Sequence, residues 1–141
     1  MEYSEGIIWS DAFSIGNDQI DKDHQQIIEI LNKLIELNQK KINQKKFAEI
    51  LWMMTEYSIH HFKKEEDYML KLNYPKIKGH KVQHSHYINE VSVYSNEFSN
   101  SNPPDINEII GFLEKWWLSH IQNTDAEYEN FKVKNGLVAI Y

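Results

Sequence analysis

Four long stretches of this chain place their apolar residues at the period of an α-helix, which limits the folds open to it. The patterns run over residues 20–35, 47–69, 77–98 and 106–128. Short polar or proline-containing segments separate them, and no alternation of apolar and polar residues is long enough to indicate a strand. Because short connections favour antiparallel neighbours, we predict an all-α fold, an antiparallel up-down-up-down four-helix bundle with an N-terminal arm.

Capping and helix-breaking residues indicate where the helices begin and end. Asn17 or Asp18 is a suitable cap for the first helix. The segment 72–75 reads as a stop, because the residue before a proline disfavours helix. The segment 99–104 reads as a loop, and Gly136 marks an end. We expect one domain over residues 1–141, divided into an arm (1–17), a bundle (18–132) and a tail (133–141).

Composition excludes several classes of protein. The net charge of −6 weakens the case for nucleic acid or an anionic membrane as partner. The chain has no cysteine, which excludes disulfides, thiolate zinc sites and iron–sulfur clusters. No run reaches the roughly 18 apolar residues that span a bilayer, and the start lacks the pattern of a signal peptide. We therefore expect a cytoplasmic protein.

Histidines lie on the apolar stripes themselves, where a polar side chain needs a buried partner. A single histidine in such a place is usually a hydrogen-bonded core residue. Several of them, spread over four helices and accompanied by two carboxylates, make independent core histidines a minor alternative. The histidines on the stripes are His24, His61, His80, His84 and His120.

Two pairs of these polar residues are spaced by one helical turn. His61 precedes Glu65 by four residues, and His80 precedes His84 by four. Residues at this spacing lie on nearly the same helix face, so each pair can point at one metal ion. Their neighbours His60, Glu66 and His86 fall off these faces and read as solvated or peripheral.

Asp125 follows His120 by five residues, a less regular spacing. In an ideal helix this rotates the aspartate about 140° away from the histidine. Either Asp125 reaches in from the flank, or the helix is locally widened, as π-type turns at functional sites are. A solvated aspartate at a helix end also remains open.

The donor types narrow the choice of metal. Imidazole with carboxylate suits iron, zinc, copper or nickel and argues against magnesium and calcium. Seven donors divide unequally between two metals, which leaves one metal a free position for a small molecule. The spacing thus predicts a histidine-rich dinuclear site without naming the element, and a structural zinc bundle stays open.

Nearly the whole chain, from Trp9 to about Tyr128, carries the motifs of one known family. The matching segments are Trp9-Ser10, Gly16, Ile20-Asp21-x-x-His24, His61-Phe62-x-x-Glu65-Glu66-x-x-Met69, Tyr74-Pro75-x4-His80-x3-His84 and Trp117-Leu118-x-His120-Ile121-x3-Asp125. These segments resemble the hemerythrin family, and more closely its single-domain bacterial branch, the bacteriohemerythrins. The combined pattern is highly specific, although H-x-x-x-H alone is weak.

The resemblance implies a non-haem di-iron centre that binds dioxygen reversibly. It implies that one iron has three histidine ligands, that the other has two, and that two carboxylates and an oxo or hydroxo group bridge them. The second iron then keeps one free place. The implied ligands are His80, His84 and His120 on one iron, His24 and His61 on the other, and the bridges Glu65 and Asp125.

Three apolar residues within a turn of these ligands are candidates for a dry wall around dioxygen: Ile27, Trp117 and Ile121. Ordinary core packing explains them equally well. We expect a dioxygen-binding protein for storage, transport or delivery, not an enzyme. Oxygen or redox sensing, and the handling of iron, peroxide or nitric oxide at the same centre, stay as alternatives. The sequence does not identify a protein partner.

Overall fold

The computed structural model describes residues 6–41, 44–98 and 104–137, and within these ranges it is helical and contains no strand. Its elements in chain order are η1 (Asp11–Phe13), α1 (Asp18–Gln39), α2 (Gln44–Leu72), α3 (Ile77–Glu97), α4 (Ile106–Ser119), the π-helix η2 (His120–Asp125) and α5 (Ala126–Lys134).

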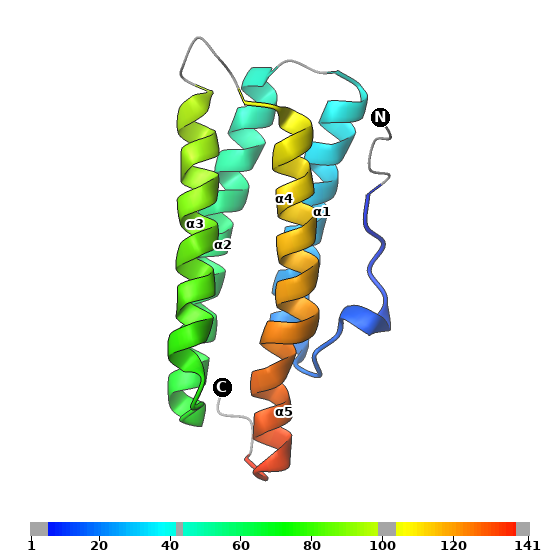
Figure 1. Cartoon of the computed structure of the whole chain (residues 1–141). Coiled ribbons are helices and arrows are strands. Elements are labelled where there is room, and N and C mark those ends of the chain that lie inside the picture. The colour runs from blue at the N-terminus through cyan, green and yellow to red at the C-terminus, as the bar shows by residue number, and fades with distance from the viewer. Residues whose placement is uncertain (1–5, 42–43, 99–103, 138–141) are drawn as a thin grey trace.

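The helices form four rods that lie side by side (Figure 1). The fourth rod is continuous and consists of α4, η2 and α5. The first rod, α1, packs against α2 and α4, and α2 packs against α3. The predicted fold class, a four-helix bundle preceded by an arm, is confirmed. Most of the loop expected at 99–104 lies outside the described residues, as do 1–5 and 138–141.

The boundaries follow the capping chemistry of the sequence. The side chain of Asn17 accepts a hydrogen bond from the backbone N–H of Ile20 across 3.2 Å and so caps α1. Helix α2 ends at Leu72, and Asn73 then adopts a positive φ of 55°. Helix α5 extends to Lys134, two residues beyond the expected end of the bundle at 132.

The arm, residues 6–17, runs beside the bundle and is fastened to α1 (Figure 1). The Asn32 side chain forms hydrogen bonds of 2.8 Å with both the N–H and the C=O of Ile7. Nearer the start of α1, Asp21 accepts hydrogen bonds from the Ser14 hydroxyl at 2.5 Å and from the Ile15 N–H at 3.0 Å. The arm therefore covers the first helix at two separate points.

The core consists of two apolar clusters with a polar layer between them. Along α1, Ile20 belongs to the smaller cluster and Ile27 to the larger one, and His24 lies between them. The other helices show the same arrangement. In α2, Glu65 lies between Phe62 of the larger cluster and Tyr68 of the smaller one. In the fourth rod, Asp125 lies between Ile121 of the larger cluster and Tyr128 of the smaller one. Apolar side chains thus pack against the polar layer on both sides along the bundle axis.

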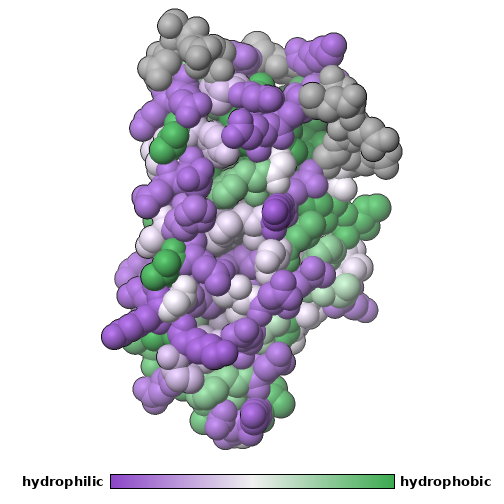
Figure 2. Space-filling model, in the orientation of Figure 1, coloured by the Kyte–Doolittle hydropathy of each residue, from purple (hydrophilic) through white to green (hydrophobic). Residues whose placement is uncertain are grey.

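The outer surface is mixed in character. Figure 2 shows mainly hydrophilic side chains on one face, with isolated apolar ones on the left of the view and a larger apolar group on the right. Among the described residues, no helix combines the length and the apolar character needed to cross a membrane.

Candidate metal centre

The polar layer contains two overlapping groups of potential metal ligands, and within each group the ligand atoms lie within 4.8 Å of one another. Both groups include Glu65 and Asp125. One adds two histidines, His24 and His61, and the other adds three, His80, His84 and His120. All seven side chains are buried. The structure therefore brings together every residue that the sequence analysis singled out as a ligand, while their metal binding stays a prediction.

Asp125 joins the two groups because the helix widens beneath it. Residues His120–Asp125 form a π-helix, so the second of the two geometries considered for this spacing is the one adopted. One oxygen of Asp125, Oδ1, lies 2.9 Å from His80 Nε2 and 3.0 Å from His120 Nε2. The other, Oδ2, lies 2.9 Å from His24 Nε2. The aspartate is fully buried, so it is not a solvated residue at a helix end.

Glu65 occupies the matching place on α2. Its Oε1 lies 3.2 Å from His84 Nε2 and 3.4 Å from His61 Nε2. Its Oε2 accepts a hydrogen bond of 2.7 Å from the Tyr128 hydroxyl. One carboxylate oxygen therefore faces a histidine of each group, and the other is held by a tyrosine.

Several of these nitrogen–oxygen contacts are short but do not have the geometry of a hydrogen bond. His24 Nε2 and both oxygens of Asp125 are buried without a hydrogen-bond partner, as are Nε2 of His61 and His80. Since buried polar atoms are normally paired, this concentration of unpaired atoms calls for a further occupant. Metal cations between the nitrogens and the carboxylates would satisfy them together. The residues present therefore fit a pair of metal ions of the imidazole- and carboxylate-binding class.

In three of the histidines, the Nδ1 atom, which faces away from the polar layer, contacts a side-chain oxygen that orients the ring. His61 Nδ1 lies 3.0 Å from an oxygen of Asp23, and His120 Nδ1 lies 3.0 Å from Oε1 of Gln83. When Nε2 binds a metal, Nδ1 carries the proton and donates it to such an oxygen, which fixes the ring. These contacts direct the Nε2 atoms of both histidines into the polar layer.

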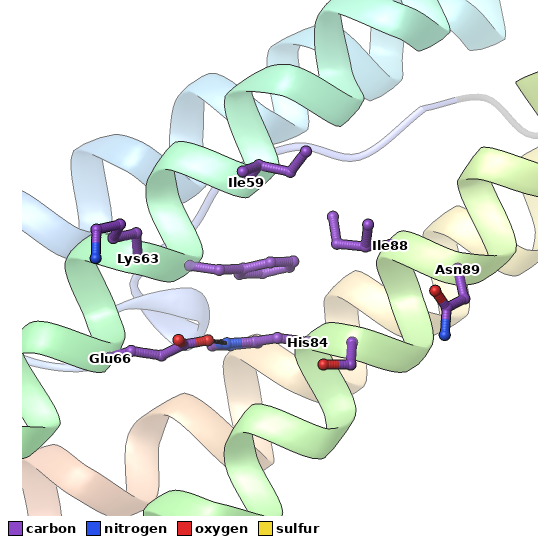
Figure 3. A pocket seen from close by; sticks show the side chains of 8 residues that line it. Ile59, Lys63, Glu66, His84, Ile88 and Asn89 are labelled. Atoms are coloured by element: carbon purple, nitrogen blue, oxygen red, sulfur yellow. Dashed lines mark hydrogen bonds and ion pairs between the residues drawn. The ribbon is translucent and has the colours of Figure 1, made fainter.

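The third of these contacts corrects the interpretation of Glu66. The sequence analysis read it as solvated or peripheral, but its side chain is only partly exposed and its Oε2 lies 2.8 Å from His84 Nδ1. Figure 3 shows Glu66 reaching from α2 to the His84 ring on α3, at the edge of a surface hollow of about 380 Å³. By contrast, His60 and His86 are exposed, as expected.

These orienting residues share a signal that sequence reasoning missed. Asp23, Glu66 and Gln83 each directly neighbour a predicted ligand in sequence. Adjacent residues point about 100° apart around a helix, so a polar residue beside an inward-facing ligand can lie at the seam with the next helix. There it reaches a histidine of the neighbouring helix.

Aromatic rings fix the planes of two histidines. Phe62 stacks on His84 with ring centroids 3.9 Å apart, and Trp116 stacks on His120 at 4.3 Å. Trp117, a predicted wall residue, is fully buried with its ring 6.3 Å from that of His61. The other two predicted wall residues are also fully buried and belong to the larger cluster. That these three residues line a dioxygen pocket stays a prediction. The other two are Ile27 and Ile121.

Burial and the neighbouring carboxylates shift the pKa values of the histidines in different directions. Burial alone lowers the pKa of His24, but Asp125 and Glu65 raise it by more, so the net pKa lies above its ordinary value. The pKa of His84 is raised in the same way, with Glu65 and Glu66 overcoming burial. For His120 burial outweighs the carboxylates and the pKa falls.

The two carboxylates of the polar layer remain ionised. Burial raises the pKa of Asp125, but the surrounding histidines, led by His120, lower it by more and hold it well below its usual range. Glu65 behaves similarly: burial and Asp125 raise its pKa, and the histidines, led by His61, bring it below the ordinary value. A metal ion therefore meets two charged carboxylates and competes with protons mainly at histidine.

Comparison with known proteins identifies the family of this donor set. The family model described as "Hemerythrin HHE cation binding domain" matches residues 15–131, which include all seven side chains. The chain belongs to the hemerythrin family. Its hemerythrin domain is 33% identical over 125 residues to the bacteriohemerythrin of Clostridium acetobutylicum, covering 86% of this chain and 97% of that protein. The bacteriohemerythrin of Pseudomonas aeruginosa is 32% identical over 122 residues, covering 86% and 78%.

Solved hemerythrin structures share the fold. A wild-type hemerythrin crystal structure superposes with a TM-score of 0.81 at 24% identity, covering 88% of this chain and 95% of the other. A hemerythrin mutant superposes with a TM-score of 0.83 at 23% identity, covering 90% and 97%. At these identities the likeness supports the architecture, and the chemistry of the site rests on the residues themselves.

Proposed function

We propose that this protein binds dioxygen reversibly at a non-haem di-iron centre and serves in dioxygen storage, transport or delivery. The observation that carries the proposal is the asymmetry of the donor groups, which share two carboxylates but contain three histidines on one side and two on the other. Membership of the hemerythrin family, and relatives named bacteriohemerythrin, support iron as the metal.

The proposed ligands follow the two groups. One iron is held by the three-histidine group, and the other by the two-histidine group. Glu65 and Asp125 would be shared by the two irons, because both groups include them. Because the two-histidine group offers one donor fewer than the three-histidine group, its iron would be the one with a place left for a small molecule. That place is the proposed position for dioxygen.

When bound, the iron pair supplies the electrons and the open position for dioxygen; the chain supplies orientation and a dry environment. The Nδ1 contacts fix which ring nitrogens face the metals. Ile27, Trp117 and Ile121 are fully buried beside the polar layer, so we assign them to the wall that excludes water. We assign no side chain as a general acid or base, so the proposed activity is binding rather than turnover.

Metal analysis and oxygen cycling together test this function. Protein purified without added metal should contain two irons per chain. Reduction without air followed by admission of dioxygen should produce a visible charge-transfer band that disappears when dioxygen is removed. Zinc in place of iron would overturn the proposal in favour of a structural bundle. An iron-loaded protein whose band never reverses would contradict reversible binding.

A further inference from the structure

The oxygens behind the histidines differ in charge. His61 and His84 each face a carboxylate, from Asp23 and Glu66 respectively, whereas His120 faces the neutral amide oxygen of Gln83. His61 belongs to the two-histidine group and His84 to the three-histidine group. Each proposed iron therefore has one histidine backed by a negative charge.

The two carboxylates differ in their own surroundings. Oδ2 of Asp23, the oxygen that faces His61, also lies 2.9 Å from Lys64 Nζ. Its other oxygen accepts a hydrogen bond of 3.2 Å from the Tyr57 hydroxyl. Within the described part of the chain, the only ion pair of Glu66 is the one with His84. Lys64 thus partly neutralises the Asp23 carboxylate that faces His61, whereas no lysine pairs with the Glu66 carboxylate that faces His84 among the described residues.

A shared carboxylate oxygen has a predictable effect on a metal. A carboxylate that accepts the Nδ1 proton makes the opposite ring nitrogen a stronger electron donor. A cation on the same oxygen withdraws electron density and weakens that effect. A stronger donor favours the more positive oxidation state of the metal and lowers its midpoint potential.

We propose that Asp23 and Lys64 jointly set the electron donation of His61, with Asp23 increasing it and Lys64 decreasing it, while Glu66 increases the donation of His84 without a counter-charge. This inference rests on the proposed function, because it takes His61 and His84 to be iron ligands. Asp23, Lys64 and Glu66 are positioning residues that act through the histidines. The side chain of Lys64 is 57% exposed, so the donor strength behind the iron with the open place is adjustable from the surface.

Opposite shifts of the midpoint potential in the Asp23 and Lys64 variants distinguish this role from a purely structural one. Asp23→Asn should raise the midpoint potential, because the carboxylate behind His61 is lost. Lys64→Met should lower it, because that carboxylate is no longer shared. Lys64→Arg keeps the charge and should stay closer to the wild type than Lys64→Met. A contact that only supports the fold predicts no such reversal, since removing either partner would loosen the same place.

The experiment measures midpoint potentials of the di-iron protein at low ionic strength, where an exposed lysine is least screened. Lys71→Met, an exposed lysine near the end of α2, is the matched control and should leave the potential unchanged. Glu66→Gln should raise the potential, as Asp23→Asn does. Shifts of Asp23→Asn and Lys64→Met in the same direction, or no shift in either, would overturn the inference.

Zinc affinity provides a readout that needs neither iron nor dioxygen. Asp23→Asn and Glu66→Gln should each weaken zinc binding about 10- to 100-fold. Lys64→Met should bind zinc as tightly as the wild type or more tightly. If the wild type fails the iron and dioxygen test, the proposed function falls while these zinc affinities still judge the positioning residues. If the wild type passes and the variants do not follow this order, only the inference fails.

Discussion

Tyr128 donates a hydrogen bond of 2.7 Å from α5 to Glu65 on α2. The tyrosine is fully buried and reaches the carboxylate from the smaller apolar cluster. Because Oε2 is held in this way, Oε1 is turned toward His61 and His84. One hydroxyl therefore orients the carboxylate that joins the two halves of the proposed centre.

Removal of that hydroxyl should loosen the centre. Tyr128→Phe leaves a buried carboxylate oxygen without its donor, which costs about 1–3 kcal/mol. We expect a lower melting temperature and faster loss of iron to a chelator. Tyr94→Phe, in a partly buried tyrosine on α3, is the control and should change stability by less than about 0.5 kcal/mol. Equal chelation rates for Tyr128→Phe and the wild type would contradict this role of Tyr128.

His84 should be indispensable, whereas its neighbour His86 should not. His84→Ala removes one nitrogen from the three-histidine group, leaves Glu66 without its histidine partner and leaves Glu65 with His61 as its only histidine partner. We expect weaker iron retention and a lower melting temperature, because metal binding is coupled to folding. His86→Ala changes an exposed residue and should keep the iron content of the wild type. An unchanged iron stoichiometry in His84→Ala would refute the assignment of His84.

Metal affinity should rise with pH above the ordinary histidine value of 6.5. His24 and His84 have raised pKa values, so in the metal-free fold their protonated forms contribute stability below 6.5 that is lost as pH rises through the raised pKa. A metal must displace those protons, so its binding has the opposite dependence. Zinc titrations in weakly buffered solution, run at a series of pH values on both sides of 6.5, should show proton release and affinities that still increase above 6.5. A flat profile over this range would contradict the prediction.

Ile121 should protect bound dioxygen in addition to packing the core. Ile121→Val and Ile109→Val each remove one buried methylene and should cost about 0.5–1.5 kcal/mol. Both residues are fully buried in the larger cluster, but Ile109 lies eleven residues before His120 in the same rod. Stopped-flow and absorbance decay should therefore show a shorter lifetime of the dioxygen-bound protein for Ile121→Val alone. Equal lifetimes in the two variants would assign Ile121 to packing only.

The bundle and its polar layer could be predicted because the same physical rule governs both. Helical periodicity marks the buried face, and a histidine on that face, such as His24 or His61, needs a polar partner there. Position on the apolar stripe then separates His61 from His60 without knowledge of the fold. The sequence left the geometry of Asp125 open, because spacing alone does not show where a helix widens, and the structure places that widening at the aspartate.

Residues behind the ligands were harder to predict because they depend on how two helices face each other. Glu66 lies next to Glu65 in sequence, but its partner His84 is on α3. Asp23 likewise meets its partner on α2, where His61 and Lys64 share it. Periodicity describes one helix at a time, so contacts across a seam follow only after the rotation of both helices is known.

The uptake of dioxygen per iron tests the central claim most directly. The reduced protein, with its iron content determined, should take up one dioxygen for every two irons and release it intact when the dioxygen pressure is lowered. That result requires two irons acting as one site with a single open place. Uptake of one dioxygen per iron, or consumption without release, would contradict the account.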